Sequence, residues 1–297
     1  MKTVHFNLYD KLIIWYCLLT TLAIIILGRP LSEYYGEIIF YISMAGLTAL
    51  IVYFIDENKN GWTKFFRTIY PIVMFTFFYT ATGGLMFLLF DKFYDFQLTA
   101  FEHSIFGFNP TLYIDQHLLN VWLNEIFSGC YFLYYFMIPG FVILLLVKKN
   151  YTVLKSFLSA TCLTFFASYW LFFLYPIEGP RYHFVNNFQN SIEGPVFRKM
   201  VEMVIANGAV HGGCMPSSHF GVALVILLYC YKFYRKIAYG LTPIVIGLAI
   251  GTFWGRFHYI SDVVIGGTIG LIAVIIIWHY DNRNSKIVYN QKAKEEN

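Results

Sequence analysis

The chain has 297 residues, of which 58% are hydrophobic and 13% are charged, and its formal net charge is +4. A soluble domain has about 45–50% apolar and about 25% charged residues, so these charged side chains are too few to cover a soluble surface of this size. The composition also excludes a disordered chain, and the scattered basic residues form no dense face for nucleic acid. We therefore expect a protein that crosses a membrane several times.

Eight apolar segments predict an all-α, polytopic bundle of about eight spans, organised as a single membrane domain over residues 1–297. Most of them approach the ~20 residues that a spanning helix needs. They lie at residues 12–28, 38–55, 69–90, 126–147, 156–175, 219–234, 237–254 and 263–280. The sixth is the weakest, because its most apolar part runs only from Phe220 to Tyr231. The phospholipid bilayer is thus the first expected partner.

The distribution of basic residues predicts how the chain crosses the membrane. Most of the 21 Lys and Arg residues fall in the loops that share a side with the termini. By the positive-inside rule, both termini are then cytoplasmic, with a cytoplasmic tail at 281–297. The loops 91–125, 176–218 and 255–262 face the outer side, which is periplasmic, extracellular or lumenal.

The long loop 91–125 is expected to be an interfacial amphipathic segment. Its phenylalanines are interleaved with acidic residues: Phe93, Phe96, Phe101, Phe106 and Phe108 with Asp91, Asp95, Glu102 and Asp115. This pattern predicts short helices that lie in the outer membrane interface. We expect a structural lid, and gating of substrate access is the alternative.

Polar clusters at three predicted span ends could carry chemistry on the outer side. His258 and Asp262 are four residues apart, so a helix places them on one face. The carboxylate can then hold one imidazole nitrogen and leave the other free to attack. Arg256 is close by in sequence and could bind an anionic oxygen. A structural His–Asp pair with an interfacial Arg is the alternative interpretation.

The second cluster, Pro216-Ser217-Ser218-His219, is typical of a helix start. Backbone N–H groups and hydroxyls at a helix N-terminus bind anions, and His219 adds a titratable group. Arg181 follows another span end. Each cluster could be purely structural, but together they suit phosphoryl transfer, in which catalysis is mostly positioning and charge stabilisation.

The order Arg181, Pro216-Ser217-Ser218-His219 and Arg256-x-His258-Tyr259-x-x-Asp262 resembles the type 2 phosphatidic acid phosphatase (PAP2) superfamily. The superfamily includes lipid phosphate phosphatases and inositol-phosphorylceramide synthase-like transferases. The resemblance implies a PAP2-like catalytic core at 126–280 and an active site at the outer membrane interface. It also implies metal-independent chemistry through a phosphohistidine, without a cofactor.

The resemblance also assigns roles to individual residues. His258 would be the nucleophile, Asp262 would orient it, and His219 would protonate the leaving oxygen. The phosphate would be bound by Arg181, Ser217 and Ser218. Because imidazole titrates near pH ~6.5, this pairing predicts a mildly acidic to neutral pH optimum.

Four positions depart from the usual family motifs. Leu174 and Tyr182 stand where the family has Lys and Pro, and Ser218 replaces a Gly. Thr252 occupies the position of the third motif's Arg, so Arg256, two residues before the His, is a conjectural phosphate ligand. These departures are more similar to the synthase-like branch than to the phosphatases.

The leading hypothesis is a lipid phosphatase that transfers the phosphoryl group to water. The alternative with the same first step is a phospho-headgroup transferase, in which an alcohol is the acceptor. A membrane transport or binding protein is the alternative from another class. A metal site made of His219, His258 and Asp262 is a further alternative.

Overall fold

The structure is a computed structural model that describes the backbone of residues 5–295 and the side chains of residues 5–284. Its secondary structure is 78% helical, and the described residues form no strand. A lone bridge joins Ile177 to Gly213. The expected all-α membrane fold is confirmed.

The helices follow one another through short connections, apart from the longer ones after α3, α8 and α9. The α-helices are α1 (Leu8–Leu27), α2 (Tyr35–Phe54), α3 (Gly61–Ala81), α4 (Asp95–Phe106), α5 (Pro110–His117), α6 (Val121–Val147), α7 (Tyr151–Leu174), α8 (Pro180–His183), α9 (Phe197–Gly208), α10 (Ser218–Phe233), α11 (Arg235–Trp254) and α12 (Ile260–Glu295). Two 3-10 helices, η1 (Leu31–Tyr34) and η2 (Thr82–Leu85), extend α2 and α3.

Six helices in the described part of the chain are long and apolar enough to cross a membrane. They are α1, η1 with α2, α6, α7, α11 and the Ile260–Asn284 part of α12. The other two predicted spans also form helices, but α10 has 16 residues and α3 is less apolar. The third predicted span also ended too late, because α3 gives way to η2 after Ala81. The chain is thus a multi-pass membrane protein.

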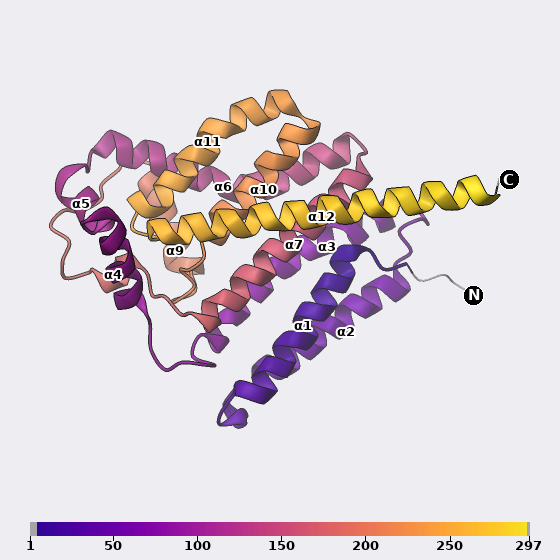
Figure 1. Cartoon of the computed structure of the whole chain (residues 1–297), viewed down its shortest axis with the longest axis horizontal. Coiled ribbons are helices and arrows are strands. Elements are labelled where there is room, and N and C mark those ends of the chain that lie inside the picture. Colours follow the sequence, from indigo (N-terminus) through magenta and orange to yellow (C-terminus); the bar gives the residue numbers. More distant parts are fainter. Residues whose placement is uncertain (1–4, 296–297) are drawn as a thin grey trace.

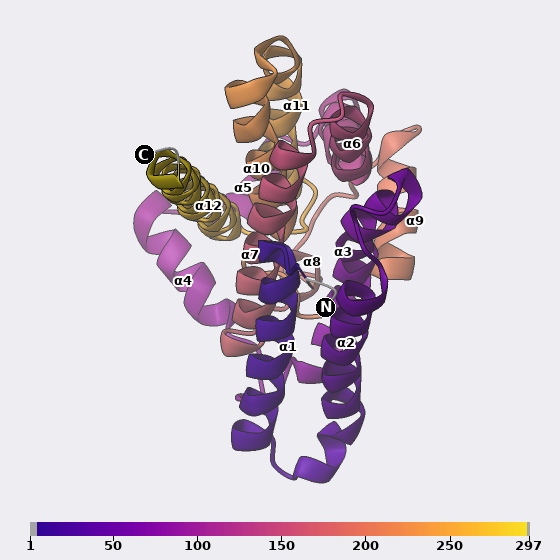
Figure 2. The same ribbon diagram turned by 90° about the vertical axis from the view of Figure 1, so that its right-hand side faces the viewer.

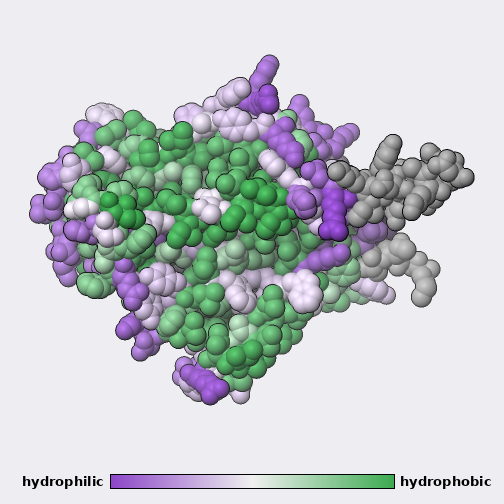
Figure 3. Space-filling view, viewed as in Figure 1, coloured by the Kyte–Doolittle hydropathy of each residue, from purple (hydrophilic) through white to green (hydrophobic). Residues whose placement is uncertain are grey.

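The helices pack around α7, whose apolar stretch is the most buried of the six. α1 packs on α2 and α7, while α10 packs on α7, α11 and α12. α6 completes the bundle against α11 (Figures 1 and 2). Apolar surface covers the middle of the molecule and hydrophilic residues gather toward its ends (Figure 3). α1 begins at the same end of the molecule at which α12 finishes, whereas α4 and α5 lie at the other end (Figure 1).

Glycines bring the beginnings of α10 and α12 into close contact. A Cβ on Gly266 would lie 2.2 Å from the carbonyl oxygen of Ser217, and one on Gly270 would lie 2.4 Å from that of Gly221. Any larger residue would therefore force the two backbones apart. This contact matters because the predicted site residues flank it, at the first turn of each helix.

We predict that Gly266→Ala destabilises the protein, although alanine is the better helix former. The new methyl group would collide with the α10 backbone, and overpacking of this kind costs about 1–3 kcal/mol. Thermal unfolding in detergent measures the effect.

Gly46→Ala in α2 is the matched control, because nothing lies within 4 Å of its Cβ position. There the same substitution should be neutral or stabilise by up to about 1 kcal/mol. Equal melting temperatures for the two variants would contradict the proposed role of the close contact.

Candidate active site

His258 and Asp262 pair at the start of α12, but the helix begins at Ile260, so the two residues do not share a helical face as the four-residue spacing predicted. His258 lies just before the helix, and its Nδ1 is 3.4 Å from Oδ2 of Asp262. Both residues are buried. The same Oδ2 accepts hydrogen bonds from the Tyr259 backbone N–H and the Cys214 thiol, each at 2.9 Å. Nδ1 therefore faces the carboxylate, and Nε2 is the imidazole nitrogen left for a substrate.

The second cluster forms the start of α10, as predicted. Ser217 is the N-cap residue, and Ser218 begins the helix. The Ser217 N–H donates to the backbone carbonyl of Asp262 at 3.0 Å. This bond joins the second and third clusters directly, at the glycine contact described above.

The two histidines face each other across the site. The ring centroids of His219 and His258 are 6.3 Å apart. His219 is packed among tyrosines of α6: its ring stacks on Tyr131 at 5.3 Å and lies 4.6 Å from Tyr134. The tyrosine rings restrict where the imidazole can turn. Sequence reasoning missed them, because tyrosine is common throughout this chain.

One cavity of about 540 Å³ joins these groups. Its polar lining includes Glu178, Arg181, Ser218, His219 and His258, together with Cys214. Its apolar lining comprises side chains of α3, α6 and α7, including Ile72, Phe75, Ile138, Pro139 and Phe165. A ligand with a polar group and an apolar body matches such a cavity.

Arg181 belongs to this cavity, and it is paired with a residue that the sequence did not single out. Glu202 on α9 forms ion pairs with both Arg181 and Arg198. Nη1 of Arg181 and Nε of Arg198 are buried, and neither has a hydrogen-bond partner among the described residues. Burial lowers the pKa of Arg198 to about 10, with Glu202 opposing the shift. The four-residue spacing of Arg198 and Glu202 in the sequence could have indicated their ion pair on one helix face.

Two predicted phosphate ligands, Ser217 and Arg256, do not line the cavity. Arg256 pairs with Asp115, donates to the carbonyl of Asn190 at 2.6 Å and covers the ring of Phe188. Its backbone is left-handed, with φ of 64°. Ser217 does not line the cavity; its Oγ is buried, with no partner in residues 5–284. The structure thus brings together Arg181, Ser218, His219, His258 and Asp262, but not Arg256.

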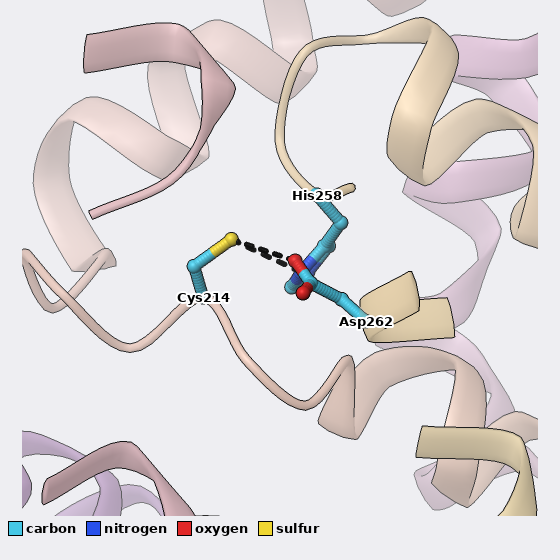
Figure 4. Close-up of side chains that lie close together, drawn as sticks. All are labelled: Cys214, His258 and Asp262. Atoms are coloured by element: carbon cyan, nitrogen blue, oxygen red, sulfur yellow. Dashed lines mark hydrogen bonds and ion pairs between the residues drawn. The ribbon is translucent and has the colours of Figure 1, made fainter. Parts of the chain in front are cut away.

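Cys214 is a second residue that sequence reasoning passed over. Its thiol lies 2.9 Å from Oδ2 of Asp262 and 3.7 Å from Nδ1 of His258 (Figure 4). Burial, with Asp262 adding to it, raises the pKa of this thiol well above its usual range, so it donates to the carboxylate as S–H. Among the described residues, Cys214, His258 and Asp262 form the cluster that could hold a metal ion. The predicted metal trio of His219, His258 and Asp262 is not such a cluster in this part of the chain.

Acidic residues of the segment 91–125 hold the loops that carry the site. Asp95 accepts hydrogen bonds from the backbone N–H groups of Glu178 and Gly179, at 2.7 and 2.8 Å, and from the Tyr259 hydroxyl at 2.9 Å. Glu102 accepts from both the N–H and the hydroxyl of Ser261 at 2.8 Å. α4 therefore fastens the first and third clusters.

Comparison with known proteins identifies the family of the chain. A family model of the PAP2 superfamily matches residues 97–276, which is more than half of the chain and includes every predicted site residue. The chain belongs to the PAP2 superfamily.

A PA-phosphatase related-family protein of Dictyostelium discoideum is 30% identical over 113 residues. The match covers 37% of this chain and 20% of that protein, so this chain corresponds to a small part of it. No solved structure matches the chain. Together the findings support a membrane protein similar to lipid phosphatases, whereas the synthase-like branch stays a prediction.

We predict that Asp95→Ala loosens the site from a distance. The substitution leaves two backbone N–H groups and a buried hydroxyl without their acceptor, and each such loss costs about 1–3 kcal/mol. The melting temperature should fall, and limited proteolysis should cut the loop after α7 faster.

Asp91→Ala is the control for this prediction, since Asp91 is an exposed carboxylate of the same segment. Asp95→Asn keeps one acceptor oxygen and should lose less stability than Asp95→Ala. If Asp95→Ala melts and is cleaved like Asp91→Ala, the anchoring role is refuted.

Proposed function

We propose that the protein is an integral-membrane enzyme that hydrolyses a lipid phosphate through a phosphohistidine on His258. The observation that carries the proposal is that two imidazoles, 6.3 Å apart, line one cavity. A nucleophile lies about 3–3.5 Å from the atom it attacks, and a proton donor about 2.6–3.2 Å from its acceptor. A phosphate group between the two rings is compatible with both distances.

The chemistry would proceed in two steps. First, the Nε2 lone pair of His258 bonds to phosphorus as the bond to the lipid oxygen breaks, and His219 gives its proton to that oxygen. Second, His219 takes a proton from a water whose oxygen bonds to phosphorus, and the P–N bond breaks to release inorganic phosphate. Asp262 holds Nδ1 throughout, which keeps the lone pair on Nε2 and stabilises the positive ring.

Arginines would bind the phosphate oxygens. Arg181 lines the cavity, and Arg198 lies behind it on the same carboxylate, Glu202. A phosphate dianion could take the place of Glu202 on these guanidiniums, because phosphate oxygens form strong charge-assisted hydrogen bonds. Ser218 and the first N–H groups of α10 supply further donors. Ser217 and Arg256 do not line the cavity, so they would act by holding neighbouring residues and not by binding the phosphate.

The apolar half of the cavity supports a lipid substrate. Ile72, Phe75 and Phe165 lie on helices of the bundle, so the acyl chains could remain among apolar side chains while the headgroup reaches the histidines. The ionisable lining residues Glu178, Arg181, His219 and His258 all lie in loops or in the first turn of a helix, which favours a reaction site over a transport path. We propose that the site faces the outer side of the membrane. It lies at the end of the molecule opposite the described chain termini (Figure 1), and the positive-inside rule predicts that the termini are cytoplasmic.

A headgroup transferase is the second candidate, and the tyrosines favour it. Tyr79, Tyr131, Tyr134, Tyr135, Tyr169 and Tyr182 line the cavity, and phenol groups can hold the hydroxyls of an alcohol acceptor. The first step would be unchanged. In the second step the acceptor alcohol would take the place of water.

The central test is phosphate release from lipid phosphates by purified protein in detergent. His258→Ala should lose at least about 10³-fold in rate, because the nucleophile is gone. His219→Ala should lose about 10²- to 10⁴-fold with a lipid substrate. Acid quenching with radiolabelled substrate should trap an acid-labile phosphoenzyme in the wild type but not in His258→Ala.

The control for this test is His103→Ala, which removes an exposed histidine of α4. Wild-type rates in His258→Ala would disprove the nucleophile. Adding diacylglycerol or ceramide separates the two candidates: a hydrolase keeps releasing inorganic phosphate, whereas a transferase forms a new phospholipid at its expense.

We predict that Glu202→Gln strengthens product inhibition by inorganic phosphate. The pair with Arg181 is about one-third exposed (35% and 32% of the two side chains), and exposed pairs are worth about 0.2–1 kcal/mol. Removing the competing charge should therefore lower the half-inhibitory phosphate concentration by up to about fivefold. Glu33→Gln, at an exposed carboxylate of η1, should leave that concentration unchanged. A higher value in Glu202→Gln would show that Glu202 positions the arginines instead.

A further inference from the structure

Three potential metal ligands converge behind the reactive face of His258. They are the Cys214 thiol, Nδ1 of His258 and Oδ2 of Asp262 (Figure 4). The three atoms are separated by 2.9 Å (S to O), 3.7 Å (S to N) and 3.4 Å (N to O). All three residues are buried, and they come from the loop before α10, the loop before α12 and the first turn of α12.

These separations are close to those of a tetrahedral zinc site. With bonds of about 2.3 Å to sulfur and about 2.0–2.2 Å to nitrogen or oxygen, tetrahedral angles put S and N about 3.6 Å apart and N and O about 3.4 Å apart. Two of the three distances already agree. The S to O distance must open by about 0.7 Å, which happens when a metal replaces the proton that Cys214 and Asp262 now share.

The trio is accessible and has spare bonding capacity. Cys214 and His258 both line the cavity, so an ion can reach them from there and a water can complete the coordination. Oδ1 of Asp262 is buried and has no hydrogen-bond partner in the part of the chain described with side chains. It could serve as an additional ligand atom.

We propose that Cys214, His258 and Asp262 form an inhibitory binding site for a thiophilic divalent cation such as Zn²⁺ or Cd²⁺. The donor set of thiolate, imidazole and carboxylate selects these ions over Mg²⁺ and Ca²⁺. One thiolate and one carboxylate neutralise the charge of the ion, which a buried site requires.

Inhibition follows from the proton balance, and this part rests on the proposed function. The ion takes the lone pairs of the thiolate and of Nδ1, so the thiol proton is released to solvent and the Nδ1 proton moves to Nε2. With a proton on Nε2, His258 has no lone pair for phosphorus. The ion thus blocks the nucleophile from the side opposite to the substrate.

Cd²⁺ titration of the purified full-length protein tests the site without reference to catalysis. Cadmium thiolates absorb in the ultraviolet, so one Cd²⁺ per chain should produce a saturable band that excess Mg²⁺ does not remove. Cys214→Ser should abolish the band, and His258→Ala should weaken Cd²⁺ binding by at least 10-fold, on the order of the loss seen even for outer partners of metal ligands.

Cys130→Ser is the matched control, because Cys130 lies on α6, is partly exposed and does not belong to the cluster of Cys214, His258 and Asp262; it should keep the band. Circular dichroism checks that each variant is folded, and Cys214→Ser and His258→Ala remove different ligands, so the result does not depend on one of them folding. A full band in Cys214→Ser, or no saturable band in the wild type, would overturn the site.

A second measurement separates the site from the proposed function. Zn²⁺ at the concentrations that displace Cd²⁺ should stop phosphate release, and a chelator should restore it. Undiminished hydrolysis with the site filled would overturn the inhibitory role. A wild type that binds Cd²⁺ but hydrolyses no lipid phosphate would refute the proposed function and the inhibition together, while the metal site would stand.

Discussion

Buried carboxylates of the segment 91–125 hold the loops around the candidate site in place, and the rest of the site depends on them. Asp95, Glu102 and Glu125 each accept backbone N–H groups from chain far away in sequence. Asp115 does the same for Gln189 and Asn190. A buried charge is tolerated only when it is paired or hydrogen-bonded, and a loop N–H needs an acceptor. The buried carboxylates and the loop N–H groups therefore satisfy each other's need for a hydrogen-bond partner.

This arrangement also explains the character of α4. Its buried face carries Asp95 and Glu102, whereas Phe96 and Phe101 on its other face are exposed. The polar face points inward and the apolar face outward, the reverse of a helix in a soluble protein. A helix that lies in the membrane interface can expose phenylalanines to lipid and still fasten loops with its carboxylates.

Asp262 is another buried carboxylate that serves several hydrogen-bond donors at once. One of its oxygens is shared by the Tyr259 N–H, the Cys214 thiol and the imidazole of His258, so one atom holds His258, the loop before α10 and the start of α12. The glycine contact between α10 and α12 then brings the ring of His219 close to that of His258. The proposed catalytic geometry and the proposed site for a thiophilic ion both depend on the same short distances.

Much of this protein is determined by local sequence. Apolar runs specify membrane helices because water-free surroundings require apolar side chains and internally bonded backbone. The four-residue spacing pointed to the His258–Asp262 pair, although His258 lies before α12 and not on its face. The helix start at Ser218 was predictable for a similar reason, since its cap residues are adjacent in the chain. The third and sixth spans were harder to predict because α3 includes Lys64 and Arg67 and α10 is short.

Only the tertiary structure decided that Arg256 pairs with Asp115 while Arg181 reaches the cavity, and that Cys214 joins His258. Such partners are set by long-range packing, which places side chains dozens of residues apart within hydrogen-bond distance and leaves no trace in local spacing.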